Sequence, residues 1–294
     1  MKIFVSALSI IFFGLFSLAA DPVSPEKIEA ILAAAILAAA PHQDAVLSAP
    51  RSVRVCWSKA DHGKGVHAYK EFAEMMSGLL NKVEHIEAKA IEGFPSDDQW
   101  AATDLVVFYL TQHTLSDAKV VQLDQHLKAG KSILVLHQAL VQRKNIERWA
   151  DRIGYAYSFD APTQSKWGPM DGAIILDPKH EIFTGFPDRI HLKDELYWNL
   201  QKGDVGNITV LGRTATPGAG ADAAPEWPVF WTVEHPSHGS AKGGRVFCSV
   251  VGHIDDLHNT PFFRTILFRG AAWCLREPFA PFRPLVSDGL LIHP

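Results

Sequence analysis

Imidazole and carboxylate side chains recur in this sequence just after predicted apolar strands. The carboxyl ends of neighbouring parallel strands meet at one edge of a sheet, so residues that follow different strands can converge on one ligand. Imidazoles and carboxylates that meet there can transfer protons or hold a divalent cation. The polar residues that follow predicted strands or lie between them are Asp61, His62, His67, Tyr69, Thr111, Gln112, His113, His137, Gln138, Asp194, Glu195, His253, Asp255, Asp256 and His258.

Two of these histidines are the strongest candidates for a site. His137 ends the apolar run ILVL, where an imidazole is costly to bury unless its nitrogens are hydrogen bonded. A structural histidine with satisfied nitrogens is the alternative. His253 follows Gly252, and a glycine lets the backbone turn sharply or approach a ligand closely.

The other candidates have plain structural alternatives. His67 can simply begin a helix, His62 lies in a polar loop, and Glu195 can pair with Lys193 on the surface. Strand aromatics are expected to pack in the core or to stack on a sugar ring, and the core is favoured for Trp57 and Trp231. We expect three further histidines to be solvated, namely His235, His238 and His258.

Several motifs that would point to other chemistry are absent from the sequence. No serine or cysteine follows ILVL, so no nucleophile elbow is visible and Ser-His-Asp hydrolysis is not expected. No GxGxxG follows the first strand, and there is no GxxxxGK[ST], no HExxH and no cysteine pair at zinc-ribbon spacing. We therefore expect no nucleotide cofactor.

Apolar strands alternate with helices over most of the chain. This β-α-β-α order predicts an α/β protein whose parallel sheet is covered on both faces. Residues 154–200, which are rich in Pro, Gly and aromatics, are expected to be loops over the sheet, and 214–227 a surface loop. We predict strands at 53–57, 83–91, 105–110, 133–136, 208–212, 229–233 and 245–251, and helices at 67–80, 116–128 and 261–275.

The N-terminus is typical of an exported protein. Lys2 precedes the uncharged run from Ile3 to Leu18, and small residues follow, so residues 1–20 are predicted to be a signal peptide. An uncleaved anchor is the alternative, but the run is shorter than the ~20 residues that span a bilayer. We expect a periplasmic or extracellular protein with no stable membrane insertion after cleavage. Residues 21–50 should carry a helix capped by Ser24 and ended by Pro41, followed by an α/β domain over 51–280 and a C-terminal tail over 281–294.

Composition excludes several classes of protein. The 294 residues are 47% hydrophobic and 20% charged with a net charge of -4, as in a folded globular chain without a basic stripe for nucleic acid. Three cysteines cannot form a disulfide framework, because one is left over. We expect Cys56, Cys248 and Cys274 to be buried thiols, with a Cys248–Cys274 bridge left open.

Six ordered segments resemble the ThuA-like (trehalose utilisation) family, whose fold is related to class I glutamine amidotransferases. The resemblance implies a flavodoxin-like three-layer sandwich with a mostly parallel sheet. It also implies a site made of His67, His137, Glu195 and His253. We expect these residues to be catalytic or to hold a divalent metal, because three histidines and one glutamate suit zinc or manganese. We assign substrate contacts to His62, Tyr69, Gln138, Tyr197 and Asp255. The matching segments are residues 53–80, 103–140, 180–198, 228–235, 244–256 and 262–275.

The resemblance implies a role in the use of trehalose or a related glycoside. Acid/base or metal-assisted chemistry on a sugar or keto-sugar would make the protein a sugar isomerase, lyase or hydrolase. It would not be a glutaminase, because His137 stands where amidotransferases have their cysteine. The alternatives are a carbohydrate-binding module without turnover and a structural domain that binds a partner; the oligomeric state stays open.

Overall fold

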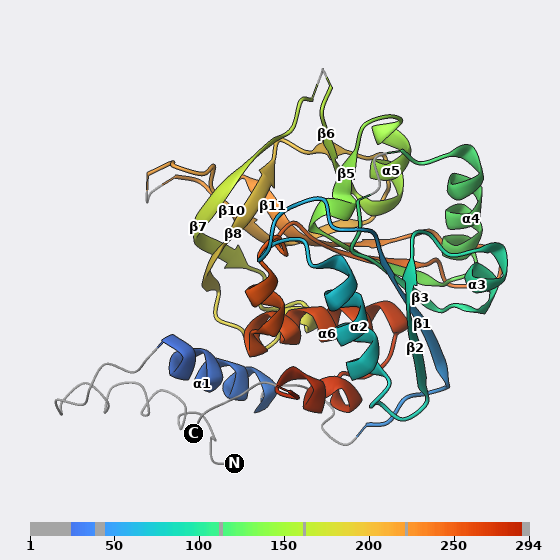
Figure 1. The fold of residues 1–294 in the computed structure, drawn as a ribbon, viewed down its shortest axis with the longest axis horizontal. Coiled ribbons are helices and arrows are strands. Elements are labelled where there is room, and N and C mark those ends of the chain that lie inside the picture. Colours follow the sequence, from blue (N-terminus) through green and yellow to red (C-terminus); the bar gives the residue numbers. More distant parts are fainter. Residues whose placement is uncertain (1–24, 39–44, 112–113, 161–162, 221–222, 290–294) are drawn as a thin grey trace, which may run out of the picture.

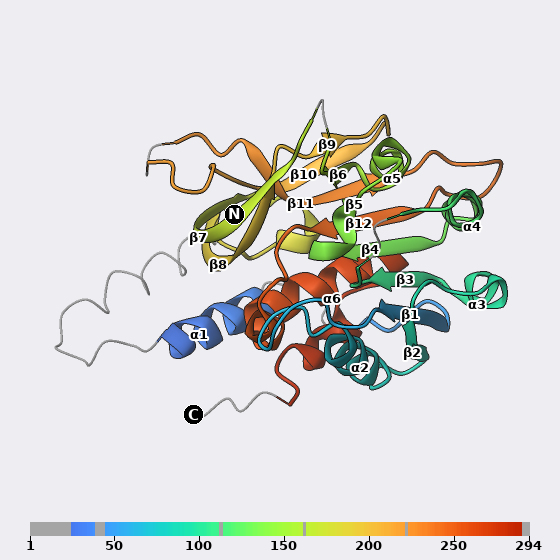
Figure 2. The same ribbon diagram turned by 45° about the horizontal axis from the view of Figure 1, so that its top comes forward.

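A nine-stranded sheet lies at the centre of the protein, with helices on both of its faces (Figures 1 and 2). The computed structural model describes residues 25–38, 45–111, 114–160, 163–220 and 223–289. The strands are β1 (Arg51–Trp57), β2 (Ile86–Glu92), β3 (Leu105–Phe108), β4 (Ser132–Leu136), β5 (Val141–Gln142), β6 (Tyr155–Ser158), β7 (Lys166–Leu176), β8 (Arg189–Trp198), β9 (Gln201–Lys202), β10 (Ile208–Thr214), β11 (Trp227–Glu234) and β12 (Arg245–Ser249). The helices are α1 (Pro25–Ala38), α2 (Tyr69–Leu80), α3 (Asp97–Ala102), α4 (Asp117–Lys128), α5 (Ile146–Ile153) and α6 (Pro261–Leu275), with 3-10 turns η1 (His137–Leu140), η2 (Glu181–Phe183), η3 (Asp255–Asn259) and η4 (Ala280–Val286).

The large sheet is mixed, in the order β2-β1-β3-β4-β12-β11-β10-β7-β8. Strands β2, β1, β3, β4 and β12 pair in parallel, whereas β11, β10, β7 and β8 continue the sheet in antiparallel pairs. The α/β class is confirmed, but the prediction of a mostly parallel sheet is wrong. A parallel neighbour needs a long crossover that is usually helical. The described residues between β7 and β8, β10 and β11, and β11 and β12 form no α-helix.

Neighbouring residues of β12 show how the two faces are covered. Phe247 packs against Gly270 of α6 so closely that a Cβ on that glycine would lie 2.4 Å from the ring. The next side chain, Cys248, points the other way, and its Sγ lies 3.5 Å from the carbonyl oxygen of Ile153 in α5. Successive strand residues face opposite sides, so α6 and α5 cover opposite faces, as Figure 2 shows.

The prediction that residues 154–200 are loops is wrong. Strands β7 and β8 form a long hairpin there, paired from Lys166 opposite Trp198 to Ile175 opposite Arg189. Along β8, side chains alternate between exposed and buried from Arg189 to Asp194, which is the pattern of a strand with one covered face. Pro169 and the glycines of β7 hide the same pattern in the first strand of the pair.

Helix ends follow the capping rules that the sequence suggests. Ser116 accepts a hydrogen bond from the Lys119 N–H at the start of α4, and Gly130 ends that helix with a φ of 80°. Helix α6 has the predicted bounds, with Thr260 as its N-cap and Pro261 in its first turn.

The chain termini add helices beside α6. The predicted signal peptide, residues 1–20, lies outside the described residues. Helix α1 lies along α6 (Figure 1), where Arg269 donates to the Ile36 carbonyl at 2.8 Å. Within the described ranges, no helix has the length and apolar character to cross a membrane. The segment assigned to a C-terminal tail begins in η4, in which Phe282, Leu285 and Val286 are buried.

All three cysteines are buried free thiols, as expected. Cys274 contacts the Ile133 carbonyl from the α6 side of the sheet, whereas Cys248 faces α5. The open Cys248–Cys274 bridge is therefore not formed.

Acid should weaken the fold through His126 of α4, which is 4% exposed. Burial lowers the pKa of His126 to about 4, although its contact with the Ser132 carbonyl opposes the shift. Between pH 4 and 6.5 the unfolded chain binds the proton that the folded chain rejects, so stability rises with pH over this window. From pH 7 to pH 5, His126 should cost about 2 kcal/mol of unfolding free energy.

Urea unfolding at pH 5 and pH 7 measures this dependence, with the variant His126→Gln as the comparison. The variant should lose about 2 kcal/mol of the difference between the two pH values, and the remainder comes from other histidines whose pKa is lowered by burial, such as His253. Equal pH dependence in both proteins would show that His126 is not the titrating group.

Candidate functional site

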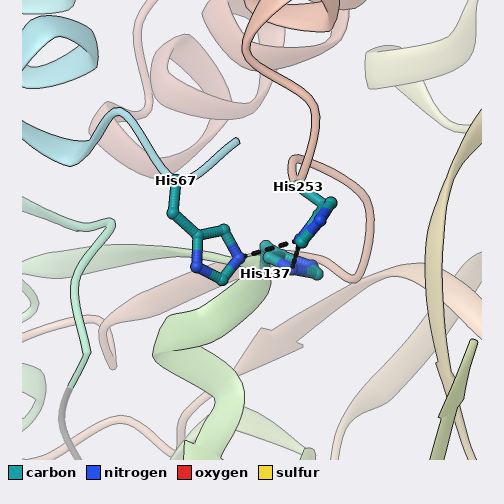
Figure 3. Close-up of side chains that lie close together, drawn as sticks. All are labelled: His67, His137 and His253. Atoms are coloured by element: carbon teal, nitrogen blue, oxygen red, sulfur yellow. Dashed lines mark hydrogen bonds between the residues drawn. The ribbon is translucent and has the colours of Figure 1, made fainter. Parts of the chain in front are cut away.

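Three histidines from distant parts of the sequence meet at one point (Figure 3). His253 Nδ1 lies 2.9 Å from His67 Nε2 and 3.2 Å from His137 Nε2. His67 and His137 are buried, and His253 is partly exposed. The predicted convergence of these imidazoles at one end of the sheet is therefore present in the structure.

The backbone at all three histidines is arranged to make them meet. His137 follows β4 at the first position of η1 with a φ of 43°, and His67 precedes α2 with a φ of 55°. Left-handed backbone at a non-glycine residue is uncommon and clusters at functional sites. Before His253, Gly252 has a φ of 134°, which only glycine adopts readily.

The Nδ1 atoms of the two buried imidazoles, which point away from His253, bond to oxygen atoms and so fix the orientation of each ring. His137 Nδ1 donates to the Val250 carbonyl at 2.7 Å, and His67 Nδ1 lies 2.9 Å from Asp61 Oδ1. A neutral imidazole carries one proton, so His137 Nε2 presents a lone pair to His253. This arrangement, with each outer nitrogen bonded to an oxygen, is the one that orients imidazoles toward a metal.

Glu195 and Tyr197 complete the cluster from β8. Glu195 Oε1 lies 3.5 Å from His137 Nε2 and 3.7 Å from His253 Nδ1. The Tyr197 hydroxyl lies 3.0 Å from the same nitrogen of His137 and donates to Gln138 Oε1 at 2.9 Å. We expected Glu195 on a loop; it lies on a strand, and its carboxylate contacts the histidines rather than Lys193.

Asp194 fastens this strand to the loop that carries His253. Its carboxylate accepts from the backbone N–H groups of Gly252 at 2.8 Å, His253 at 3.0 Å and Glu195 at 2.6 Å. The side chain is 4% exposed, and burial raises its pKa to about 7 against the pull of these donors. Asp194 is a positioning residue for both His253 and Glu195.

Asp61 is the second carboxylate that the sequence offered without singling out. It accepts from His62, His67 and Tyr69, and also from the Thr111 hydroxyl. Burial alone would raise the pKa of Asp61, but the hydrogen bonds from His67, His62 and Thr111 bring it well below its usual value. Asp61 is therefore an ionised anchor that holds the orientation of His67.

Burial sets the protonation of the remaining groups. It lowers the pKa of His137 strongly and that of His253 to about 4, with the neighbouring His67 adding to both shifts. Burial raises the pKa of Glu195. At neutral pH His137 and His253 are thus neutral, with lone pairs available.

A cleft of about 340 Å³ borders this cluster at Glu195 and Tyr197. The volume falls at the lower end of the roughly 300–1,000 Å³ range of small-molecule sites. The lining residues are Asp61, His62, Gln138, Val141, Arg143, Tyr157, Phe159, Trp167, Glu195 and Tyr197.

The residues assigned to substrate contacts divide into two groups. His62, Gln138 and Tyr197 line the cleft. Tyr69 is 1% exposed, does not line the cleft and donates to Asp61. Asp255 accepts from the Ala68 N–H at 2.8 Å. Tyr69 and Asp255 therefore support the site from the protein side.

One further histidine contradicts its sequence-based expectation. His258, expected to be solvated, is 3% exposed in η3 and packs against Phe72 and Tyr109. Its loop folds back under the site because Asp255 and Gly252 anchor it there. The core position is confirmed for Trp231, which is fully buried, whereas Trp57 is only partly buried.

The proton count of the cluster favours a cation between the histidines. His253 Nδ1 can carry only one proton, yet it faces the Nε2 atoms of both His67 and His137. At most one of these two contacts can be a well-directed hydrogen bond. The other brings two lone pairs together, and a bound cation would relieve that repulsion.

The spacing of the ligand atoms also fits a small divalent ion. Ligand atoms placed tetrahedrally at zinc–ligand distances of about 2.0–2.1 Å are about 3.3–3.4 Å apart. The two nitrogen–nitrogen distances from His253 are slightly shorter than this, and the two distances from Glu195 Oε1 are slightly longer. Three imidazoles suit zinc or manganese, and the Glu195 carboxylate lies just outside this set of ligands.

One family model matches most of the chain. Residues 53–274 match the family model ThuA, described as trehalose utilisation. The chain belongs to the ThuA family. The family is thus broadly one of trehalose utilisation, and the residues of the cluster all lie within the matched range.

Solved structures of ThuA-like proteins have the same fold. One from Parabacteroides merdae is 17% identical, with 78% of this chain and 91% of that chain covered and a TM-score of 0.57. Another from Bacteroides uniformis is 15% identical, with 82% and 98% covered and a TM-score of 0.55. No curated protein matches the chain.

The sharp turn after β4 has the form of a nucleophile elbow in this ThuA-family protein. A strand, a residue with positive φ and a helical turn follow one another, and that residue is His137. The three cysteines lie in the core and not in the cleft. The turn therefore presents an imidazole, which suits ligation or proton transfer and not acyl transfer.

Proposed function

We propose that this ThuA-family protein is an enzyme that removes a proton from an oxidised sugar, with a divalent metal held by His67, His137 and His253. The observation that carries the proposal is the meeting of three imidazole nitrogens with the carboxylate of Glu195, a residue that lines an open cleft. The family description, trehalose utilisation, supports a glucose-containing substrate.

Glu195 is the candidate base. It lines the cleft, and its raised pKa makes the carboxylate a better proton acceptor near neutral pH. His137 is fully buried and donates to the Val250 carbonyl, so it is better placed to hold the metal than to reach a substrate carbon.

The chemistry follows from the position of these groups. A carbonyl acidifies the C–H bond of a neighbouring carbinol carbon. Glu195 takes that proton, the C–H electron pair forms the C=C bond of an enediolate, and the carbonyl oxygen takes the negative charge. When bound, a divalent cation supplies the stabilisation of that oxygen. His62 and Gln138 line the cleft where they can bond sugar hydroxyls.

Proton exchange in heavy water tests this proposal without knowledge of the final product. The native protein, purified without a tag or chelator, should contain about one divalent metal per chain. In D₂O it should exchange the proton beside the carbonyl of a mono-oxidised trehalose, which NMR detects. Dialysis against a chelator should abolish the exchange, and zinc or manganese should restore it.

Two results of the exchange experiment would contradict the proposal. Exchange that persists in metal-free protein would contradict the role of the metal. Saturable sugar binding without any exchange would contradict the enzyme and favour a carbohydrate-binding module, which the aromatic lining of the cleft would also suit.

A further inference from the structure

The cleft contains aromatic side chains that the proposed proton transfer does not use. Phe159 is 39% exposed and Trp167 is 61% exposed, and both line the cleft together with Tyr157. Large aromatic surfaces left in water forgo a favourable burial. Their position in one cleft, beside a candidate reaction site, indicates a ligand that covers them.

The aromatic rings form a continuous strip from the cluster to solvent. The Tyr197 ring stacks on His137 at 4.5 Å, and Tyr157 lies 5.1 Å from Tyr197. Phe159 follows at 5.0 Å from Tyr157. A single ligand could therefore contact rings all the way from the histidines to the exposed end of the cleft.

Strand pairing fixes Trp167 beside this strip. Trp167 of β7 is directly opposite Tyr197 of β8, and residues opposite each other in an antiparallel pair share a face. The indole is thus held by a regular hairpin and is exposed. A flat, rigid, exposed ring of this kind suits the apolar face of a pyranose.

Arg143 adds hydrogen-bond donors at the same end. Its Cζ lies 4.5 Å over the Phe159 ring, and the described part of the chain places no carboxylate in ion-pair contact with it. A guanidinium stacked on a ring keeps its N–H groups free to donate sideways. Ring hydroxyls of a sugar are acceptors that fit this position.

We infer that Trp167, Phe159 and Arg143 form a subsite for a second sugar ring, so that the protein prefers a disaccharide to a free monosaccharide. The inference rests on the proposed function only for placing the first ring at the histidines. Trp167 stacks on the second ring, and Arg143 donates to its hydroxyls. Trp167 is then a specificity-determining residue.

Calorimetric titration of the native protein tests the subsite without turnover. The ligands are glucose and three disaccharides of glucose, namely trehalose, maltose and cellobiose. At least one disaccharide should bind about tenfold or more tightly than glucose. Trp167→Ala should remove most of that advantage and leave glucose affinity within about twofold, whereas Trp167→Phe should keep part of it.

Val121→Ala is the matched control, because Val121 is an exposed apolar side chain on α4 outside the cleft. It should change neither affinity. The inference falls if no disaccharide binds better than glucose, or if Trp167→Ala leaves the ratio unchanged. Loss of the disaccharide advantage in Trp167→Ala would support the subsite even if the protein showed no proton exchange. An unchanged ratio together with normal exchange would sink the subsite alone.

Discussion

Replacement of His137 by alanine should lower proton exchange by about 10³-fold while the protein stays folded. The substitution removes one of three converging nitrogens, so bound metal should also fall. The Val250 carbonyl loses its partner, which should cost about 1–2 kcal/mol of unfolding free energy. Exchange, metal content and urea unfolding are measured on the same preparation.

His85→Ala is the matched control for this variant. His85 also has a left-handed backbone, with a φ of 68°, but it is exposed and far from the cleft. The control carries the same change of side chain in the same backbone conformation and should behave like the native protein. An unfolded His137→Ala would be answered with His137→Asn, since asparagine tolerates this conformation. Normal exchange in a folded His137 variant would contradict the role of the ring.

Replacement of Asp194 by asparagine should damage both the site and the fold. The amide group turns an N–H toward one of the three backbone donors that the carboxylate now accepts. We expect metal affinity and exchange to fall about 10- to 100-fold, as for other groups that orient ligands. Leaving a buried donor unpaired should cost about 1–3 kcal/mol of unfolding free energy.

Asp171→Asn on the same hairpin makes the same chemical change at an exposed carboxylate that forms an ion pair with His191. It should leave exchange, metal affinity and stability near native values. If Asp194→Asn matched Asp171→Asn in all three, Asp194 would have no part in holding Glu195 and His253 in place.

The parallel half of the fold follows from the sequence because each of its strands carries a local signal. The run LVVF is apolar on both faces, Ser116 and Thr260 are visible caps, and Gly130 marks a helix end. In the antiparallel half, the sequence marks β10, β11 and the loop between them, but it does not mark the β7–β8 hairpin. The described residues that join β10 to β11 and β11 to β12 form no crossover helix, and this feature indicates that these strands are antiparallel.

The site was only partly predictable for a related reason. His137 and His253 end strands of the parallel half, so their meeting follows from the topology of that half. Glu195 comes from β8, the far edge of the sheet, and reaches them only because the hairpin bends back and Asp194 fastens it. Asp61 is one of many loop carboxylates, and nothing in its local sequence distinguishes its use by His67 and Tyr69.

The histidines and Glu195 also belong to parts of the sheet that differ in their resistance to local unfolding. The imidazoles follow interior strands that are buried on both faces, whereas Glu195 sits on an outermost strand that has one hydrogen-bonded neighbour. Edge elements open more readily than interior ones. A brief local opening of the β7–β8 hairpin would therefore move the Glu195 carboxylate away from the histidines. The site would then lose its base while the rest of the protein stayed folded.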